Sequence, residues 1–254
     1  MSLTITDKGG NDDFPKLEKG MYEGTLYSIV DIGSKEYKFG NEEPKKQHKV
    51  VLAFEITKAI DPADNKVLME DERPFAVSKK YTLSLHEKAA LRLDIESWRG
   101  KSLTDEELAG FDLVGLLGHT AKIEIELTQK TAEFEGGNPK IAALREPAGG
   151  TQKVPTKNEQ RAFDLEVYCN DFNGNSSPET KLMCDVFEEL PAWQQKEIEE
   201  SFEYLAANDN GGSTNQSPSA ADDLSSLTQQ TAQEMNSDNF EDKEKKLTDD
   251  DIPF

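Results

Sequence analysis

Lysine and aromatic residues alternate in one short stretch of the sequence, and both types recur in two later stretches. An ammonium group neutralises a phosphate and an aromatic ring stacks on a base, which are the two requirements for holding single-stranded nucleic acid. Each lysine taken alone is equally compatible with an ordinary solvated surface residue, so only the group carries the hypothesis. The expected DNA-contacting residues are Lys35, Tyr37, Lys38, Phe39, Lys45, Lys46, Lys49, Lys79, Lys80 and Tyr81.

A second basic set lies on a predicted helix. At about 100° per residue, Lys88, Arg92 and Arg99 fall within about 40° of one another. One interpretation is a basic ridge that contacts the DNA backbone; the other is a solvated flank in which Glu96 pairs with one of the arginines. Trp98, on the adjoining apolar stripe, is expected in the core, and the sequence alone leaves the choice for the basic residues open.

The last six residues have the composition of a docking peptide. Two apolar side chains and a proline follow three acidic residues, and a partner with an apolar pocket beside basic side chains could hold them together with a carboxylate. The preceding polar stretch is expected to be disordered, so it gives no folding reason for an apolar end. The expected partner-binding residues are Asp249, Asp250, Asp251, Ile252, Pro253 and Phe254.

Residues that would support catalysis are not grouped in this sequence. The histidines, His48, His86 and His119, are not spaced for zinc binding with Cys, Asp or Glu, and Cys169 and Cys184 form neither a C-x-x-C pair nor a disulfide framework. No phosphate-binding loop or dinucleotide fingerprint occurs. We therefore expect no enzyme activity, no catalytic residue, no metal site and no cofactor. The lack of an 18-residue apolar run predicts a protein that does not associate with membranes and is cytoplasmic.

The charge of the chain is unevenly distributed. The 254 residues carry a net charge of −21, which would ordinarily argue against nucleic acid as a ligand. Residues 1–150, however, hold 21 of the 29 Lys and Arg residues and carry only −6, whereas residues 208–254 carry −8. A local basic groove is therefore expected within the first 150 residues.

Period-two alternation predicts five strands, at residues 20–33, 48–57, 74–84, 119–128 and 140–145. In the first strand Tyr22, Leu26, Val30 and Ile32 are expected on one face. A capping box at Ser84 predicts a helix that runs to about residue 98, and a second one at Thr104 predicts a short helix.

Three strands, a helical insert and two further strands indicate a mainly β fold, a five-stranded oligonucleotide/oligosaccharide-binding (OB) barrel with the helical insert between strands three and four. An antiparallel sandwich fits the strand count nearly as well. The expected organisation is a flexible arm at 1–19, the OB domain at 20–146, a linker at 147–177, a helical segment packed on the barrel at 178–207 and a disordered acidic tail at 208–254.

Two resemblances follow from these motifs. Residues 249–254 resemble the acidic tip of the bacterial single-stranded DNA-binding protein family, where the tip docks replication and repair enzymes. The stretches 31–33, 81–88 with 96–100, and 110–118 resemble phage-encoded single-stranded DNA-binding proteins with an OB fold. That resemblance spans roughly residues 20–146 and transfers no individual contact residue. It implies a cytoplasmic location in an infected bacterial host.

The sequence thus predicts a single-stranded DNA-binding protein without sequence preference. It would act in DNA replication, recombination or repair and recruit partner proteins through its tip. It could also form a homo-oligomer. Two alternatives from other classes remain open at this point. One is an acidic DNA mimic that binds a replication or repair enzyme, and the other is an adaptor whose barrel binds protein or RNA.

Overall fold

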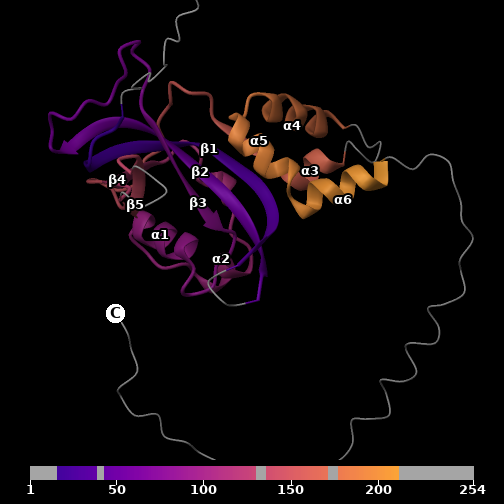
Figure 1. Ribbon diagram of the computed structural model, residues 1–254. Helices are drawn as coiled ribbons and strands as arrows, with labels where there is room; N and C mark the ends of the chain where they lie inside the picture. Colours follow the sequence, from indigo (N-terminus) through magenta and orange to yellow (C-terminus); the bar gives the residue numbers. More distant parts are fainter. Residues whose placement is uncertain (1–15, 39–42, 130–135, 171–176, 212–254) are drawn as a thin grey trace, which may run out of the picture. The chain divides into compact units, whose positions relative to one another are not determined.

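A computed structural model describes residues 16–38, 43–129, 136–170 and 177–211 (Figure 1). The five main strands are β1 (Gly20–Tyr37), β2 (Lys45–Asp61), β3 (Ala76–Thr82), β4 (Thr120–Leu127) and β5 (Pro139–Arg145). Between β3 and β4 lie α1 (Ala90–Arg99), α2 (Asp105–Ala109) and the 3-10 turn η1 (Val114–Leu116). After the sheet come β6 (Arg161–Phe163), α3 (Leu165–Cys169), α4 (Pro178–Glu188), α5 (Ala192–Glu199) and α6 (Phe202–Gly211).

The five strands form an antiparallel sheet in the order β3-β2-β1-β4-β5, so the fold is mixed α/β. β1 pairs with β2 from Met21 to Tyr37, and its first six residues also pair with β4. The short β6 then takes over from β4 as the second neighbour of β1, in parallel. β3 and β5 approach each other, but the described residues of the two are not paired. The expectation of a closed barrel is therefore corrected to an open sheet.

A bulge in β1 divides its apolar residues between two cores. The register with β2 shifts between Leu26 and Ser28, which changes the face that each later residue presents. Tyr22, Leu26 and Ile29 thus enter one core, whereas Val30 and Ile32 enter another on the opposite face. The predicted single face for Tyr22, Leu26, Val30 and Ile32 was wrong, because simple alternation does not anticipate an extra residue.

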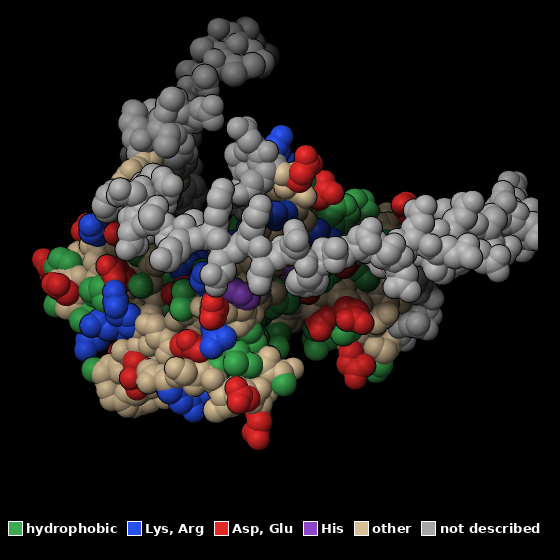
Figure 2. All heavy atoms as spheres, turned by 90° about the horizontal axis from the view of Figure 1, so that it is seen from below, with side chains coloured by type: hydrophobic (Ala, Val, Ile, Leu, Met, Phe, Trp, Pro, Cys, Tyr) green, Lys and Arg blue, Asp and Glu red, His purple; other side chains and the backbone are tan. Residues whose placement is uncertain are grey.

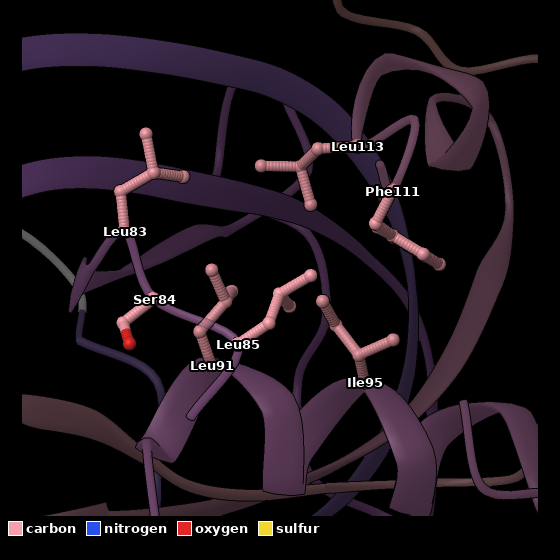
Figure 3. Close-up of a pocket in the computed structure, with 7 residues that line it drawn as sticks. All are labelled: Leu83, Ser84, Leu85, Leu91, Ile95, Phe111 and Leu113. Atoms are coloured by element: carbon pink, nitrogen blue, oxygen red, sulfur yellow. The ribbon is translucent and has the colours of Figure 1, made fainter. Parts of the chain in front are cut away.

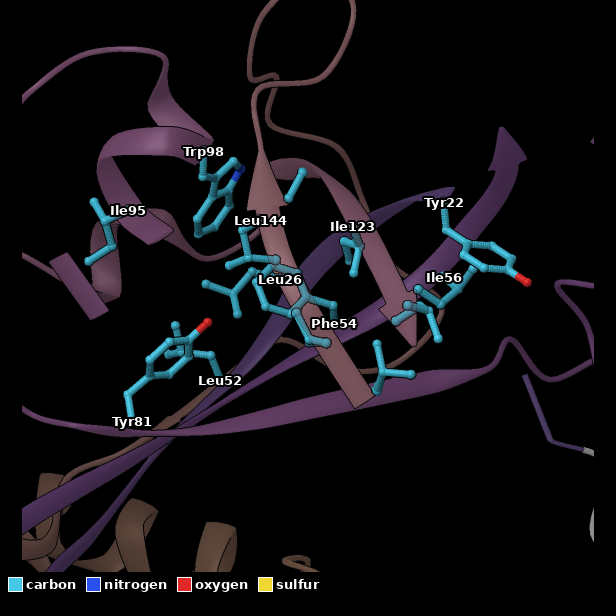
Figure 4. Close-up of a cluster of buried hydrophobic side chains, with 14 of the residues drawn as sticks. Tyr22, Leu26, Leu52, Phe54, Ile56, Tyr81, Ile95, Trp98, Ile123 and Leu144 are labelled. Atoms are coloured by element: carbon cyan, nitrogen blue, oxygen red, sulfur yellow. The ribbon is translucent and has the colours of Figure 1, made fainter. Parts of the chain in front are cut away.

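The first core lies between the sheet and α1 (Figure 4). Trp98 of α1 is fully buried, packs edge-on against Phe54 with ring centroids 5.4 Å apart, and donates its indole N–H to the Thr120 carbonyl at 2.6 Å. Its burial confirms the expected core role, and truncating such a side chain costs about 4 kcal/mol. Leu17 is also buried here, so the described end of the expected N-terminal arm belongs to the core.

The second core joins the outer face of β1 and β2 to the C-terminal helices. Figure 1 shows α3 to α6 gathered beyond β1 and β2, with α1 and α2 on the other side of the sheet. Val30, Ile32 and Val51 supply the sheet side, and Leu165 and Ile198 are among the residues that face them. The helical segment therefore packs on the outer face of the sheet.

The helix boundaries confirm one of the two predicted capping boxes. Thr104 accepts the Glu107 N–H and Glu107 accepts the Thr104 N–H, which opens α2. The Ser84 hydroxyl instead accepts the His86 N–H, and α1 begins only at Ala90. A hydrogen bond two residues ahead stabilises a turn rather than a helix start, which explains the difference.

The structure between residues 147 and 211 is richer than predicted. The expected linker contains β6 and α3, and the expected helical segment is divided into α4, α5 and α6, with a break between α5 and α6 at residues 200–201. Ser201 causes the break, because its hydroxyl donates to the Ile198 carbonyl at 2.7 Å and accepts the Tyr204 N–H at 3.3 Å. α6 extends to Gly211, into the expected tail, and residues 212–254 lie outside the described part of the chain.

Two contacts fix the position of the C-terminal helices on the outer face. Gly33 of β1 has φ 72°, and a Cβ there would lie 2.5 Å from the Ser201 Cβ, so only glycine permits this close approach. The buried Glu55 carboxylate of β2 accepts the backbone N–H groups of Lys157 and Asn158 at 3.0 and 2.7 Å. In this way β1 and β2 hold both the α5–α6 junction and the segment leading into β6.

Candidate nucleic-acid interface

Four lysines from three adjacent strands, here called the lysine strip, lie beside the C-terminal helices, and three of them share the outer side of the sheet. Lys35 of β1 lies opposite Gln47, which is two positions from Lys49 on the same face of β2. Lys49 in turn lies opposite Thr82 of β3, two positions from Lys80. The remaining member, Lys46 at the start of β2, is one position from Gln47 and so faces the other side of the strand, but its ammonium lies 3.4 Å from Glu203 of α6. The strip therefore consists of Lys35, Lys46, Lys49 and Lys80.

Lys49 lies at the centre of the strip and is held by neutral groups. Its ammonium donates to Gln47 Oε1 at 2.6 Å and to Thr82 Oγ1 at 2.8 Å, and it lies 4.6 Å from the centroid of the Tyr37 ring. Burial, followed by repulsion from Lys80, lowers the pKa of Lys49. A ligand phosphate would act against this lowering, because its negative charge favours the protonated form of Lys49.

The other strip lysines pair with three glutamates from the C-terminal helices, here called the glutamate row. Glu197 bridges two strands, because its carboxylate accepts hydrogen bonds from the ammonium groups of Lys35 at 3.0 Å and Lys80 at 2.8 Å. The Glu200 carboxylate also accepts a hydrogen bond from the Lys35 ammonium, at 2.9 Å. The row consists of Glu197, Glu200 and Glu203, so α5, α6 and the turn between them all contribute to it.

Glu203 connects α6 to both the backbone and the side chains of the sheet. One carboxylate oxygen accepts the Ser34 N–H at 2.7 Å and the other lies 3.4 Å from the Lys46 ammonium. Burial acts to raise the pKa of Glu203, but the hydrogen bonds from Ser34 outweigh it and the pKa is lowered. Glu203 is therefore ionised at neutral pH and anchors the start of α6.

The ion pairs favour the charged forms of Lys35 and Glu197. Burial acts to lower the pKa of Lys35, but its hydrogen bonds to Glu200 and Glu197 together raise it. Burial likewise acts to raise the pKa of Glu197, and the bonds from Lys80 and Lys35 lower it. Lys35 is thus held in its charged form, and carboxylates already occupy the positions beside Lys35, Lys46 and Lys80 where phosphates would bind.

His48 adds a titratable group next to the strip. Its Nε2 lies 2.6 Å from Asp31 Oδ1, and Asp31 also accepts the Gly33 N–H at 2.9 Å. The hydrogen bond to Asp31 is the main reason that the pKa of His48 is raised. Protonation would add a positive charge beside Lys46 and Glu203, both of which act on this imidazole.

Two predicted contact residues lie on the opposite, inner face of β3. Tyr81 is 2 % exposed and its hydroxyl donates to Asp94 of α1 at 2.8 Å; Lys79 donates to the same carboxylate at 2.7 Å. A ring buried in this way cannot stack on a base, so Tyr81 is removed from the candidate site. Lys79 is removed with it, because its ammonium is directed toward α1, away from Lys80.

The basic residues of α1 are engaged within the fold. Arg92 donates to Glu96 at 3.0 Å and to the Leu85 carbonyl at 3.2 Å. Arg99 pairs with Glu107, which lowers the pKa of that carboxyl to about 2, and its guanidinium lies 5.4 Å from the Phe111 ring centroid. These contacts favour the solvated-flank interpretation over a basic ridge, and Lys88 alone of the set remains an exposed lysine without a role in this network.

The remaining predicted residues fall into two groups. Lys38 and Lys45 are exposed beside the strip, at the end of β1 and the start of β2. Phe39 lies outside the described residues, as does the expected partner-binding tip at 249–254. The structure therefore places Tyr37 beside Lys49 of the strip, and it tests neither Phe39 nor the tip.

The described surface also includes a face of mixed charge and an apolar hollow. On the face shown in Figure 2, basic and acidic side chains are interspersed. A hollow of about 170 Å³ lies between residues 83–85, α1 and the segment 111–113, but its lining is apolar apart from Ser84 (Figure 3). Among the described residues, three or more His, Cys, Asp or Glu side chains do not group as a metal site would require. Within the same residues, the helices are too short or too polar to cross a membrane.

The C-terminal helices contribute residues that the sequence did not predict. Besides the glutamate row, Trp193 of α5 and Phe202 of α6 lie beside strip lysines, with the Lys80 ammonium 5.8 Å and the Lys46 ammonium 5.1 Å from the respective ring centroids. The three-residue spacing of the glutamates was visible as one acidic edge of a helical segment. The sequence did not indicate that this acidic edge lies next to lysines more than a hundred residues earlier in the chain.

Comparison with known proteins leaves the geometry as the basis for function. No protein-family model matches the chain, and no match was found among curated proteins.

Proposed function

We propose that this protein binds single-stranded DNA, with little sequence preference, across the lysine strip. The observation that carries the proposal is the convergence of three lysines, Lys35, Lys49 and Lys80, and the Tyr37 ring on one side of three adjacent strands. Such a surface combines phosphate neutralisation with an aromatic face, which is how sequence-tolerant single-strand binding works.

The sheet order supports an OB-type interpretation of the fold. β3-β2-β1-β4-β5, with helices inserted between β3 and β4, is the strand order of an OB barrel that is open between β3 and β5. OB barrels are commonly partly open, and their strand 2–3 surface and adjoining loops bind oligonucleotides. Lys46, Lys49 and Lys80 lie on β2 and β3, and the remaining strip lysine is at the end of β1 that leads into β2.

The proposal includes a role in DNA replication, recombination or repair, with partner proteins recruited by residues 249–254. This part rests on the sequence of the tip: three aspartates followed by Ile-Pro-Phe. An apolar pocket flanked by basic side chains on a partner enzyme would complement it.

The test is a titration of fluorescently labelled oligo-dT with the full-length protein, beside a duplex of equal length. We expect tight binding of the single strand, weaker binding of the duplex, and a loss of affinity as salt rises from about 50 to about 200 mM. A protein that binds neither DNA would refute the proposal.

An acidic DNA mimic is the alternative that a specific observation favours. The chain carries a net charge of −21, and the carboxylates of the glutamate row could bind the phosphate-binding groups of a DNA-binding enzyme. The same titration separates the two functions, because a mimic would not bind the labelled strand but would displace it from a DNA-binding enzyme.

A further inference from the structure

Two large aromatic rings of the C-terminal helices are exposed beside the lysine strip. Trp193 is 45 % exposed and Phe202 is 40 % exposed, whereas Trp98 and Phe54 of the first core are fully buried. Exposed rings of this size are costly in water, and they are enriched where a ligand later covers them.

The packing of α5 and α6 does not account for these rings. The helices are anchored on the outer face by Leu190, Ile198 and Ala207, which are buried in the second core. Trp193 and Phe202 are not part of that core. Their positions are therefore not required to attach the helices to the sheet.

The same pairing of an aromatic ring with a lysine occurs at three of the strip lysines. Lys49 lies 4.6 Å from the Tyr37 ring centroid, Lys46 lies 5.1 Å from that of Phe202, and Lys80 lies 5.8 Å from that of Trp193. The three rings come from three elements, β1, α6 and α5. A single strand of nucleic acid presents the complementary repeat, since each base is attached next to a phosphate.

We propose that Trp193 and Phe202 stack on bases of a bound single strand, so that α5 and α6 form the second wall of the site. Lys80 and Lys46 then contact the phosphates next to the stacked bases. In the structure the Glu197 carboxylate lies 2.8 Å from the Lys80 ammonium, and the Glu203 carboxylate lies 3.4 Å from the Lys46 ammonium. Phosphate oxygens replace these carboxylates when the strand binds. This inference rests on the proposed single-stranded DNA binding and assigns residues to it.

Tryptophan fluorescence tests this assignment directly, because only one of the two tryptophans of the chain can contact a ligand at the site. Trp98 is fully buried with its indole N–H bonded to Thr120, so a ligand on the outer face does not reach it. Unlabelled oligo-dT should therefore quench the fluorescence of Trp193 alone. We expect quenching in the full-length protein and its loss in Trp193→Phe, which keeps a ring for stacking.

Affinity for labelled oligo-dT provides the second measurement. Trp193→Ala and Phe202→Ala should each weaken binding by about 5- to 100-fold, the range for losing one stacked base. Leu205→Ala is the matched control, since Leu205 is an exposed apolar residue of α6 at 48 % exposure, and it should bind as the unmodified protein does. Thermal unfolding followed by circular dichroism checks that each variant is folded.

The outcomes separate this inference from the proposed function. If the unmodified protein does not bind labelled oligo-dT, the proposed function fails and the inference fails with it. If the protein binds but Trp193 is not quenched, and both alanine variants bind like Leu205→Ala, the stacking assignment is overturned while single-strand binding stands. If an alanine variant unfolds, the quenching of the unmodified protein and its absence in Trp193→Phe still decide the role of Trp193.

Discussion

Lys79 and Lys80 are neighbours on one strand, yet they belong to different regions of the molecule. Lys79 faces inward, where it shares the Asp94 carboxylate with the buried Tyr81 hydroxyl. Lys80 faces outward, where it shares Glu197 with Lys35. The inner partner comes from the helix that follows the strand, and the outer partner comes from a helix more than a hundred residues later.

The burial of its carboxylate partner distinguishes a cation that stabilises the fold from one that is available to a ligand. The inner pair is formed by a side chain at 15 % exposure and satisfies a buried hydroxyl, so breaking it leaves a polar group without a partner inside the core. The outer pairs lie at the surface, where water or another anion can replace each carboxylate. Inner substitutions should therefore reduce stability, and outer substitutions should change binding.

The largest effect is expected from removing two outer cations together, in Lys35→Ala with Lys80→Ala. Single-strand affinity should fall by roughly 10- to 100-fold, because a hydrogen bond to a charged group contributes about 1.5 kcal/mol. The slope of log affinity against log salt should become shallower by about 1.4, at about 0.7 per phosphate contact. Lys79→Ala is the matched control. An equal loss of affinity in Lys79→Ala would remove the distinction between the two faces.

On the inner face, Asp94→Ala should lower the free energy of unfolding by about 2 kcal/mol, since the buried Tyr81 hydroxyl and the Lys79 ammonium both lose their acceptor. Urea unfolding followed by circular dichroism measures the change. Under conditions where the variant is folded, its affinity for oligo-dT should match that of the unmodified protein. A binding defect without a stability defect would contradict the structural role.

Removing the glutamate row should move binding in the opposite direction. Glu197→Gln, Glu200→Gln and Glu203→Gln combined should bind oligo-dT about three- to tenfold more tightly at low salt, since surface ion pairs contribute about 0.2 to 1 kcal/mol each. Glu199→Gln removes the same charge from α5 but lies outside the row, and it should have a smaller effect. Equal gains per charge in both proteins would show that general repulsion, and not the row, limits binding.

The smallest effect concerns pH. Because the Asp31 carboxylate raises the pKa of His48, protonation is favoured in the folded protein. The stabilisation is complete below the unfolded pKa of about 6.5 and is lost as pH rises through the higher folded value. Urea midpoints from about pH 5.5 to about pH 8.5 should show that the difference from His48→Gln, about 0.5 kcal/mol, shrinks with rising pH. Asp31→Asn should reproduce that trend; a difference that grows with pH would contradict it.

Local pattern was sufficient for much of the sheet and for one side of the site. Period-two alternation in β2 puts Leu52 and Phe54 on one face, and both lie in the core; the Thr104 capping box was also confirmed. The same alternation in β3 puts Lys79 and Tyr81 on the face of the buried Val77, so strict use of it would have excluded both from the site.

Features that depend on contacts distant in sequence could not be predicted. The β1 bulge became apparent only through its register with β2, and the positions of Trp193 and Phe202 depend on how Ile198 and Ala207 pack against the sheet. Periodicity describes which side of an element is apolar, but it does not specify which other element covers that side.

The outer cover of β1 and β2 also determines the order in which the protein can be completed during synthesis. Val30 and Val51 leave the ribosome long before the residues of β6 to α6 that bury them, and the delay is on the order of ten seconds at typical elongation rates. During that interval the nascent sheet can form its inner core with α1 while its outer side remains apolar and open. A newly made chain therefore passes through a stage that needs protection from aggregation, and it leaves that stage only when its last helices are translated.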